Sequence, residues 1–305
     1  MSVFELLAAS PALFIGTCLV LGLLVGSFLN VVIYRLPIIL ERQWREQYTE
    51  LQGADRPAPL PGAAKPAEPF NLVVPRSACP ACKAPITALQ NIPILSYLVL
   101  RGRCAACGVR ISARYPLIEA VTGMLSAAVA WKYGFGWPTA AGIMLTWFLI
   151  ALTFIDVDHQ LLPDDLTLPL LWIGLLLSLW GPQADGPPFP VDTRSSIIGA
   201  IAGYLSLWSV YHLYRLLTGL EGMGYGDFKL FAALGAWLGW QMLLPIILFA
   251  AAVGAIVGIA LIAVRGQSRS TPIPFGPFLA AAGWLVLMFG PEVVTRWLGL
   301  FAARP

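Results

Sequence analysis

Long uncharged apolar segments dominate this sequence and restrict the folds open to it. The first, from Leu6 to Tyr34, carries no charge and exceeds the roughly 20 residues that a helix needs to span a bilayer. Of the 305 residues, 58% are hydrophobic and 11% are charged, and the mean hydropathy is +0.76. Because soluble globular domains are far more polar than this, the sequence predicts an all-α polytopic membrane protein.

Seven further apolar segments follow, separated by breaks rich in glycine, proline or charge. They run over residues 115–131, 138–155, 163–181, 195–217, 227–242, 245–264 and 274–290. We therefore expect about eight transmembrane helices. The length of the first segment, and Glu5 in place of a basic residue before it, argue against a cleavable signal peptide. Three parts are predicted: a first transmembrane helix at 1–36, a polar region at 37–114 and a membrane domain at 115–305.

Basic residues are concentrated in the polar region. Eleven of the 19 Lys and Arg lie between Arg35 and Arg114. Acidic residues are interleaved with them, which argues against binding of nucleic acid. By the positive-inside rule this region faces the cytoplasm, so an even number of spans leaves both termini outside. Within it, residues 53–69 have the composition of a linker.

Four cysteines of the polar region follow the spacing C-x2-C-x21-C-x2-C, at Cys79, Cys82, Cys104 and Cys107. Two such pairs offer four thiolates on tight turns, which suits the tetrahedral coordination of zinc in zinc ribbons. Gly108 is able to take the left-handed conformation that closes the second turn. Disulfide or redox use is the alternative, but a cytoplasmic location disfavours it. We expect a structural zinc site in a small zinc-ribbon-like insertion between the first two helices.

Two acidic clusters lie at the ends of predicted helices. Asp156 directly follows an apolar run and is the deepest acid of its cluster, whereas Asp227 follows a run of alternating glycines, Gly222, Gly224 and Gly226. Ionisable groups at membrane depth are costly and usually functional, and glycines allow helices to approach closely. The predicted topology places both clusters at the cytoplasmic face. We therefore expect Asp156 and Asp227 to share one site.

Structural roles compete with this interpretation. Asp164 and Asp165 follow Pro163 and are suited to capping and starting the fourth helix, while Asp158 can simply face water. Asp227 can be the N-cap of the sixth helix. A nucleotide-binding role for the glycine run is disfavoured, because no strand precedes it.

Several motifs, in order along nearly the whole chain, resemble the type IV prepilin peptidases of bacterial inner membranes. The glycine–aspartate motif is also shared with the wider intramembrane aspartyl proteases. The stretches that carry the resemblance are Gly26–Pro37, the cysteines around Asn91–Tyr97, Arg114–Pro116, the cluster at Asp156 and Gly222–Lys229.

The resemblance implies that Asp156 and Asp227 are the catalytic aspartates of the domain at 115–305. It implies cleavage of a basic leader from prepilins or pseudopilins at the cytoplasmic face, followed by methylation of the new amino terminus with S-adenosylmethionine. No Rossmann-type fingerprint for the methyl donor occurs. We place the donor site in the cysteine region, with Gly102 as a candidate contact, although a turn glycine is the alternative there.

Two other functional classes compete with a peptidase. A proton-coupled transporter would use Asp156, Asp227 and His212 as a relay, but transporters usually place such acids near the midplane of the membrane. A non-enzymatic assembly protein would use the cysteine domain for docking, and it would not require two aligned acids.

Overall fold

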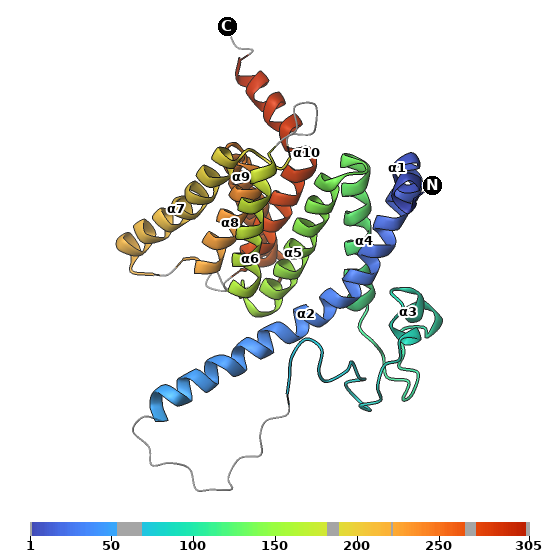
Figure 1. Cartoon of the computed structure of the whole chain (residues 1–305). Coiled ribbons are helices and arrows are strands. Elements are labelled where there is room, and N and C mark those ends of the chain that lie inside the picture. The colour runs from blue at the N-terminus through green and yellow to red at the C-terminus, as the bar shows by residue number, and fades with distance from the viewer. Residues whose placement is uncertain (1, 54–68, 182–188, 221, 266–272, 303–305) are drawn as a thin grey trace. The chain divides into compact units, whose positions relative to one another are not determined.

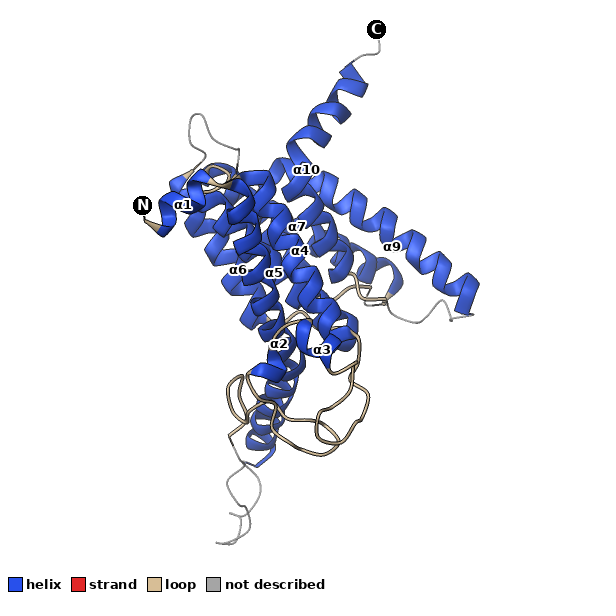
Figure 2. Ribbon diagram, turned by 90° about the vertical axis from the view of Figure 1, so that its right-hand side faces the viewer, coloured by secondary structure: helices blue, strands red, loops and turns tan. Residues whose placement is uncertain are grey.

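The computed structural model describes residues 2–53, 69–181, 189–220, 222–265 and 273–302, with side chains given except at 52–53, 265 and 291–302. Residues 54–68, most of the predicted linker, lie outside the described residues. Helices form the whole regular structure of the described part, and no strand occurs there (Figure 2). The prediction of an all-α chain is therefore confirmed. Two isolated antiparallel bridges, Ala78 with Pro85 and Arg103 with Arg110, lie in the cysteine region.

Figure 1 labels the α-helices by their order along the chain. The helices are α1 (Val3–Ala9), α2 (Pro11–Gly53), η1 (Leu89–Asn91), α3 (Leu95–Val99), α4 (Arg114–Tyr133), α5 (Trp137–His159), α6 (Asp164–Leu177), η2 (Ser178–Trp180), α7 (Thr193–Thr218), α8 (Tyr225–Leu238), η3 (Trp240–Met242), α9 (Leu243–Arg265) and α10 (Gly276–Ala302).

Each predicted apolar segment is largely helical, although Leu6–Tyr34 is interrupted at Ser10 between α1 and α2. Four stretches of the described chain are long and apolar enough to cross a membrane, namely Pro11–Leu51, Trp137–His159, Thr193–Thr218 and Trp240–Val264. Helices α6 and α8 have only 14 residues each, which is short of the roughly 20 residues of a full span. The number of spans therefore stays a prediction.

Helix α2 continues well beyond the predicted end of the first span. It runs through Pro37 to Gly53. The proline removes one backbone hydrogen bond, but the following turns are rich in Glu, Arg and Gln, which favour helix. Arg45 also pairs with Glu41 one turn earlier, at 2.6 Å between Nη2 and Oε1. Local propensity thus extends the helix past the apolar segment.

The chain divides into two compact units, one made of Met1–Cys18 and Leu125–Pro305, the other of Leu19–Met124. In the first unit α8 is the central helix and contacts α6, α7, α9 and α10 (Figure 1). Phe228, Leu234 and Trp237 of α8 are almost completely buried. Because α8 is apolar around its circumference, it is buried on all sides.

Close packing of α7 on α8 depends on glycine. Gly199 of α7 lies directly against Gly235 of α8, and a Cβ added to either would collide with the carbonyl group of the other. One turn further along α7, a Cβ on Gly203 would lie 2.6 Å from the Phe231 carbonyl oxygen. The hydroxyl of Ser196 donates to the Ala236 carbonyl at 2.6 Å. Small residues thus bring the two backbones together, as is typical of helix pairs in membranes.

The second unit combines part of α2 and the beginning of α4 with the cysteine region. Gly26 lets the two helices meet, since a Cβ there would lie 2.8 Å from the Cα atom of Glu119. Asn30 Nδ2 donates to the Tyr115 carbonyl oxygen at 3.2 Å. Arg35 is buried and donates to the Asn71 carbonyl oxygen at 2.9 Å. These contacts fix the start of the cysteine region against the helices of its own unit.

Candidate functional site

Asp156 lies in the last turn of α5 and is only 5% exposed. Its Oδ2 accepts a hydrogen bond from the backbone N–H of Gly276, the first residue of α10, at 3.0 Å. Helix α5 ends close by because Gln160 takes a left-handed conformation and donates to the Asp156 carbonyl. The aspartate is therefore held between the end of one helix and the beginning of another.

Asp227 lies in the first turn of α8 and is 7% exposed. The N-cap of this helix is Gly224, so the alternative in which Asp227 itself is the N-cap is wrong. Its backbone N–H donates to the Gly224 carbonyl at 3.2 Å. Oδ1 of Asp227 is buried and has no hydrogen-bond partner among the described residues. A buried oxygen without a hydrogen-bond partner destabilises the fold unless a ligand binds it. Polar atoms left without a partner in this way are common at functional sites.

The two aspartates belong to one site. Both carboxylates are buried within the first unit. Leu162 lies beside both: a Cβ on Gly226, next to Asp227, would lie 2.6 Å from Leu162 Cβ, and a Cβ on Gly276 would lie 3.1 Å from its methyl groups. The expected juxtaposition of the two acidic clusters is thus present in the first unit.

Gly276 and Leu162 are site residues that sequence reasoning did not identify. A Cβ on Gly276 would lie 2.6 Å from Asp156 Oδ2, so only glycine fits there without moving the carboxylate. The sequence offers a weak signal, since Gly276 stands between Phe275 and Pro277 at the beginning of the last apolar segment. The sequence analysis assigns this position only to a predicted transmembrane helix, at 274–290.

The remaining acids of the first cluster are exposed. The N-cap of α6 is Pro163, and neither Asp164 nor Asp165 caps the helix; both lie in its first turn. Asp164 instead accepts two hydrogen bonds from Lys229 Nζ, at 2.6 and 2.8 Å. This ion pair joins the beginning of α6 to the beginning of α8, two residues after Asp227.

The four cysteines of the second unit form a compact cluster. Their sulfur atoms all lie within 4.8 Å of one another, with 3.8 Å between Cys79 and Cys107 and 4.0 Å between Cys82 and Cys104. A tetrahedral zinc with Zn–S bonds of about 2.3 Å requires sulfur atoms about 3.8 Å apart. All four thiols are free rather than paired in disulfides. The donor set therefore fits a four-thiolate zinc site.

Two equivalent turns bring the thiols together. In the first, Lys83 N–H donates to the Cys79 carbonyl at 2.9 Å, and in the second, Gly108 N–H donates to the Cys104 carbonyl at 2.9 Å. Lys83 has φ +62° and Gly108 has φ +72°. The left-handed conformation predicted for Gly108 is confirmed, and the first turn adopts the same shape at the cost of placing a lysine in it.

Charge in the cysteine cluster also favours a cation. Backbone N–H groups of Cys82 and Ala81 lower the pKa of the Cys79 thiol to about 6. At Cys107 the Val109 backbone lowers the pKa, but burial and the neighbouring cysteines outweigh it and raise the pKa to about 11. One thiolate thus forms readily, while repulsion opposes the next. A divalent cation relieves that repulsion.

Gly102 forms part of a cavity of about 290 Å³ beside the second cysteine turn, lined also by Tyr97, Arg101, Arg103, Arg110 and Ile111. Its φ is +66°, and a Cβ would lie 2.9 Å from Tyr97 Cζ and Oη. Gly102 is therefore a turn glycine, because its left-handed backbone conformation favours glycine. The same glycine leaves the Tyr97 ring in contact with a pocket that carries several positive charges.

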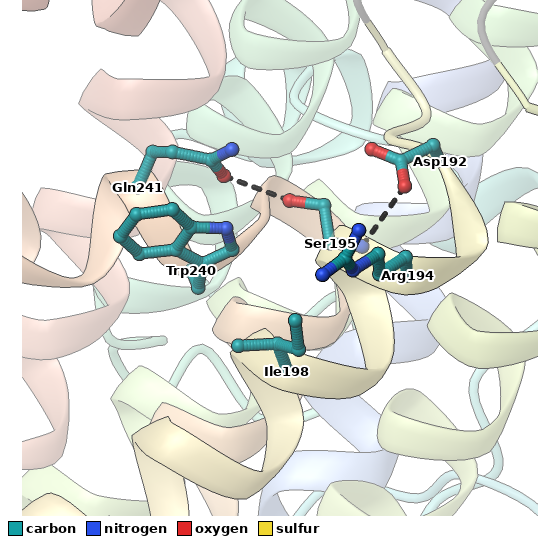
Figure 3. Close-up of a pocket in the computed structure, with 6 residues that line it drawn as sticks. All are labelled: Asp192, Arg194, Ser195, Ile198, Trp240 and Gln241. Carbon is teal, nitrogen blue, oxygen red and sulfur yellow. Dashed lines mark hydrogen bonds between the residues drawn. The ribbon is translucent and has the colours of Figure 1, made fainter.

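A second cavity, of about 430 Å³, lies where α7 begins and η3 follows α8 (Figure 3). Asp227 lies at the other end of α8. Ser195 Oγ donates to Gln241 Oε1 at 2.7 Å, and Asp192 Oδ1 accepts from Ser195 N–H at 3.0 Å. These polar groups satisfy one another, and Asp192 serves as the N-cap of α7. The cavity is therefore separate from the site of Asp156 and Asp227, and it adds no acidic residue to that site.

His212, a member of the alternative transporter relay, packs among aromatic rings. Its ring centroid lies 4.3 Å from that of Trp208 and 5.1 Å from that of Tyr211. Tyr211 in turn contacts Tyr225 and Phe228, at 5.4 and 5.6 Å between centroids. This cluster anchors the beginning of α8 against α7.

Comparison with known proteins agrees with the two-unit organisation. The family model described as Bacterial Peptidase A24 N-terminal domain matches residues 20–133, and the one described as Type IV leader peptidase family matches residues 143–259. No solved structure matches the chain.

Curated relatives match over almost the entire chain. Proteins named prepilin leader peptidase/N-methyltransferase are 54% identical in Aeromonas salmonicida, over 96% of each chain, and 51% identical in Stutzerimonas stutzeri, over 98% of each chain. The relative of the same name in Pseudomonas aeruginosa is 48% identical over 98% of each chain. These names give no support to the transporter alternative. The chain belongs to the type IV leader peptidase family.

Proposed function

We propose that this inner-membrane protein removes the leader peptide from type IV prepilins and from type II secretion pseudopilins and then N-methylates the new amino terminus. The relatives' name covers both a prepilin peptidase and an N-methyltransferase. The observation that carries the peptidase assignment is the pair of buried carboxylates of Asp156 and Asp227, whose neighbours Gly276 and Gly226 both lie against Leu162. We assign these two residues as the catalytic dyad.

Two close carboxylates in a partly desolvated site hold one proton between them at neutral pH. The ionised partner draws a proton from water, and this water attacks the scissile carbonyl carbon. The protonated partner donates a hydrogen bond to the carbonyl oxygen and supplies the proton that the leaving amine needs. The Gly276 amide stabilises the negative charge on Asp156 Oδ2, whereas the buried Oδ1 of Asp227 has no hydrogen-bond partner among the described residues. Because such a dyad titrates as a unit, the two roles belong to the pair.

A location at the cytoplasmic face of a multi-pass fold of eight spans suits this chemistry. A prepilin has a basic leader in the cytoplasm and an apolar helix in the bilayer, so its cleavage point lies at the inner interface. Asp156 at the end of α5 and Asp227 at the beginning of α8 lie at helix ends. Asp158, Asp164 and Asp165 are all exposed and add negative charge to attract the leader, and Asp164 also pairs with Lys229.

The methyl donor, S-adenosylmethionine, supplies a methyl group activated on a sulfonium. We assign its site to the cavity at Gly102 in the second unit. Arg101, Arg103 and Arg110 suit the carboxylate of the donor, and the Tyr97 ring suits its sulfonium cation. At about 290 Å³ the cavity is at the lower limit for ligand pockets, roughly 300 Å³. It therefore suits the amino-acid part of the donor.

Zinc in the cysteine cluster would serve a structural role. Cys79, Cys82, Cys104 and Cys107 would hold it, and four thiolates leave no coordination position for substrate. The ion would keep the two cysteine turns together, and Cys104 is two residues from Gly102. Methyl transfer thus depends on the metal through the shape of the donor site.

The peptidase assignment is tested with Asp156→Asn and Asp227→Asn in purified full-length protein. We expect either change to reduce leader removal by at least about 10³-fold, as is usual when a group essential to general acid–base catalysis is lost. Asp158→Asn is the matched control and should keep cleavage within about tenfold, because this residue is exposed. Product mass, measured after incubation with a prepilin, reports cleavage.

A second substrate separates the two activities. A subunit already cleaved, with a free amino-terminal Phe, should still be methylated by Asp227→Asn. Loss of methylation there would contradict separate sites, and efficient leader removal by either dyad variant would refute the catalytic assignment.

A further inference from the structure

Glu119 is a buried acid that the peptidase chemistry does not use. It lies in the second turn of α4, within the second unit, and is 9% exposed. Its Oε2 accepts a hydrogen bond from the backbone N–H of Ile94 at 2.8 Å. Among the described residues, no Lys or Arg is ion-paired with it. Burial of a carboxylate costs free energy unless hydrogen bonds offset its desolvation. The Ile94 amide supplies one such hydrogen bond.

Ile94 has an unfavourable backbone conformation, with φ +59° and ψ −49°. Leu95 N–H donates to the Pro93 carbonyl at 2.5 Å across it. This is a γ-turn with positive φ, which is rare and strained, and strain of this kind persists only where the surroundings enforce it. A carboxylate that accepts the central N–H enforces it, because charge-assisted hydrogen bonds are the strong ones.

The turn directly precedes α3, which carries Tyr97 into the cavity at Gly102. Gly102 N–H donates to the Tyr97 carbonyl at 2.8 Å, and the Tyr97 ring leaves no room for a Cβ on Gly102. The direction in which the chain leaves Ile94 therefore decides where the Tyr97 ring lies. The contact between Glu119 of α4 and the turn at Ile94 is thus connected, over three residues, to the wall of the cavity.

We propose that Glu119 is a positioning residue for methyl transfer: by holding the turn at Ile94, it keeps Tyr97 in the wall of the methyl-donor site. This inference rests on the proposed location of that site. It assigns Glu119 no part in leader cleavage, because Asp156 and Asp227 lie in the other unit. It also requires only an acceptor oxygen at position 119, not a charge that takes up a proton.

The test compares Glu119→Gln with Glu119→Ala in full-length protein in detergent. Glutamine keeps an acceptor oxygen at the same reach, whereas alanine removes it. The dissociation constant for S-adenosylmethionine is measured without peptide substrate, and methylation of a pre-cleaved subunit and cleavage of a prepilin are measured on the same preparations. For Glu119→Ala we expect donor affinity to fall about ten- to hundredfold, the range for one hydrogen bond to a charged group. Cleavage should stay within about twofold, and Glu119→Gln should bind the donor within about threefold of the unchanged protein.

A suppressor makes the test independent of whether one variant folds well. Glycine adopts positive φ without strain, so Ile94→Gly removes the need for enforcement. Combined with Glu119→Ala, it should recover most of the lost donor affinity. Failure of this recovery, a Glu119→Gln variant as defective as Glu119→Ala, or unchanged donor binding in Glu119→Ala would each overturn the proposal.

Gly102→Lys distinguishes failure of this inference from failure of the proposed donor site. Its side chain would meet Tyr97 inside the cavity. If Gly102→Lys abolishes donor binding while Glu119→Ala does not change it, the site stands and the role of Glu119 is wrong. If Gly102→Lys binds the donor normally, the donor site itself is misplaced, and the inference falls with it.

Discussion

At the scale of single residues, the position of the Asp156 carboxylate depends on the backbone of Gly276. The amide donates to Oδ2 at 3.0 Å, and the same oxygen would lie 2.6 Å from a Cβ at this position. A single methyl group therefore displaces the carboxylate by several tenths of an ångström and weakens its hydrogen bond. Catalytic rates are sensitive to shifts of this size.

We expect Gly276→Ala to lower leader cleavage about ten- to hundredfold, since misplacement of about 1 Å costs up to 10²-fold. Methylation of a pre-cleaved subunit should be unchanged, because Gly276 lies in the other unit from the proposed donor site. Both activities are measured by product mass. Gly254→Ala in α9 is a matched control, because a Cβ there would lie 3.3 Å from the nearest Phe278 ring atom, at the far end of a side chain that can turn. Normal cleavage by Gly276→Ala would show that the contact with Asp156 is unimportant.

At the scale of helices, the start of α8 is fixed by its contacts with α7. Gly199 and Gly235 allow the backbones to touch, and the aromatic rings of Tyr211 and Phe228 pack together near the other end of the pair, 5.6 Å between centroids. Lys229 adds an ion pair to Asp164 of α6. A partly exposed pair of this kind contributes only about 0.2–1 kcal/mol, so glycine packing is the larger contribution to the position of Asp227.

Gly235→Ala should separate α7 from α8, because its Cβ would collide with the Gly199 carbonyl. Overpacking of a well-packed interface costs about 1–3 kcal/mol, and we expect a clearly lower midpoint of thermal unfolding in detergent together with weaker cleavage. Gly16→Ala is the control, since a Cβ there meets nothing within 4 Å and alanine favours helix. A Gly235→Ala protein as stable as the control would contradict the packing argument.

At the scale of the whole molecule, each proposed site lies within a single unit. Asp156, Asp227 and Gly276 belong to the unit that contains Leu125–Pro305, whereas the cysteines, Gly102 and Glu119 belong to Leu19–Met124. Coupling between the activities is therefore not required by the contacts that build either site. Loss of the metal should affect the second unit selectively.

We expect one zinc per chain in protein purified without chelator, bound through the four cysteines. Binding energy at structural zinc sites is about 10–16 kcal/mol and is folding energy of the domain, so removal of the metal should unfold the cysteine turns. Methylation should then fall much further than cleavage, and helix content measured by circular dichroism should change little, because η1 and α3 are short. Metal analysis and both assays check this. Absence of metal, or equal loss of both activities in folded protein, would contradict it.

Much of this organisation could be predicted from local sequence. Apolar segments locate the helices α2 and α4 to α10, since a helix that spans a bilayer needs about 20 predominantly apolar residues in a row. The cysteine spacing predicts the cluster, because two short turns suffice to build it. The order of motifs indicates the family, which the similarity to curated relatives confirms.

Contacts between distant segments were decided only by the tertiary structure. The hydrogen bond from Gly276 to Asp156 joins residues 120 positions apart, and the pair of Glu119 with Ile94 depends on how α4 meets the cysteine region. Likewise, Asp164 was expected to cap a helix but pairs with Lys229. Apolar patterns and spacings report how a segment behaves with its near neighbours along the chain. Which helix ends meet depends instead on the packing of whole helix faces, and no local pattern of residues specifies that packing.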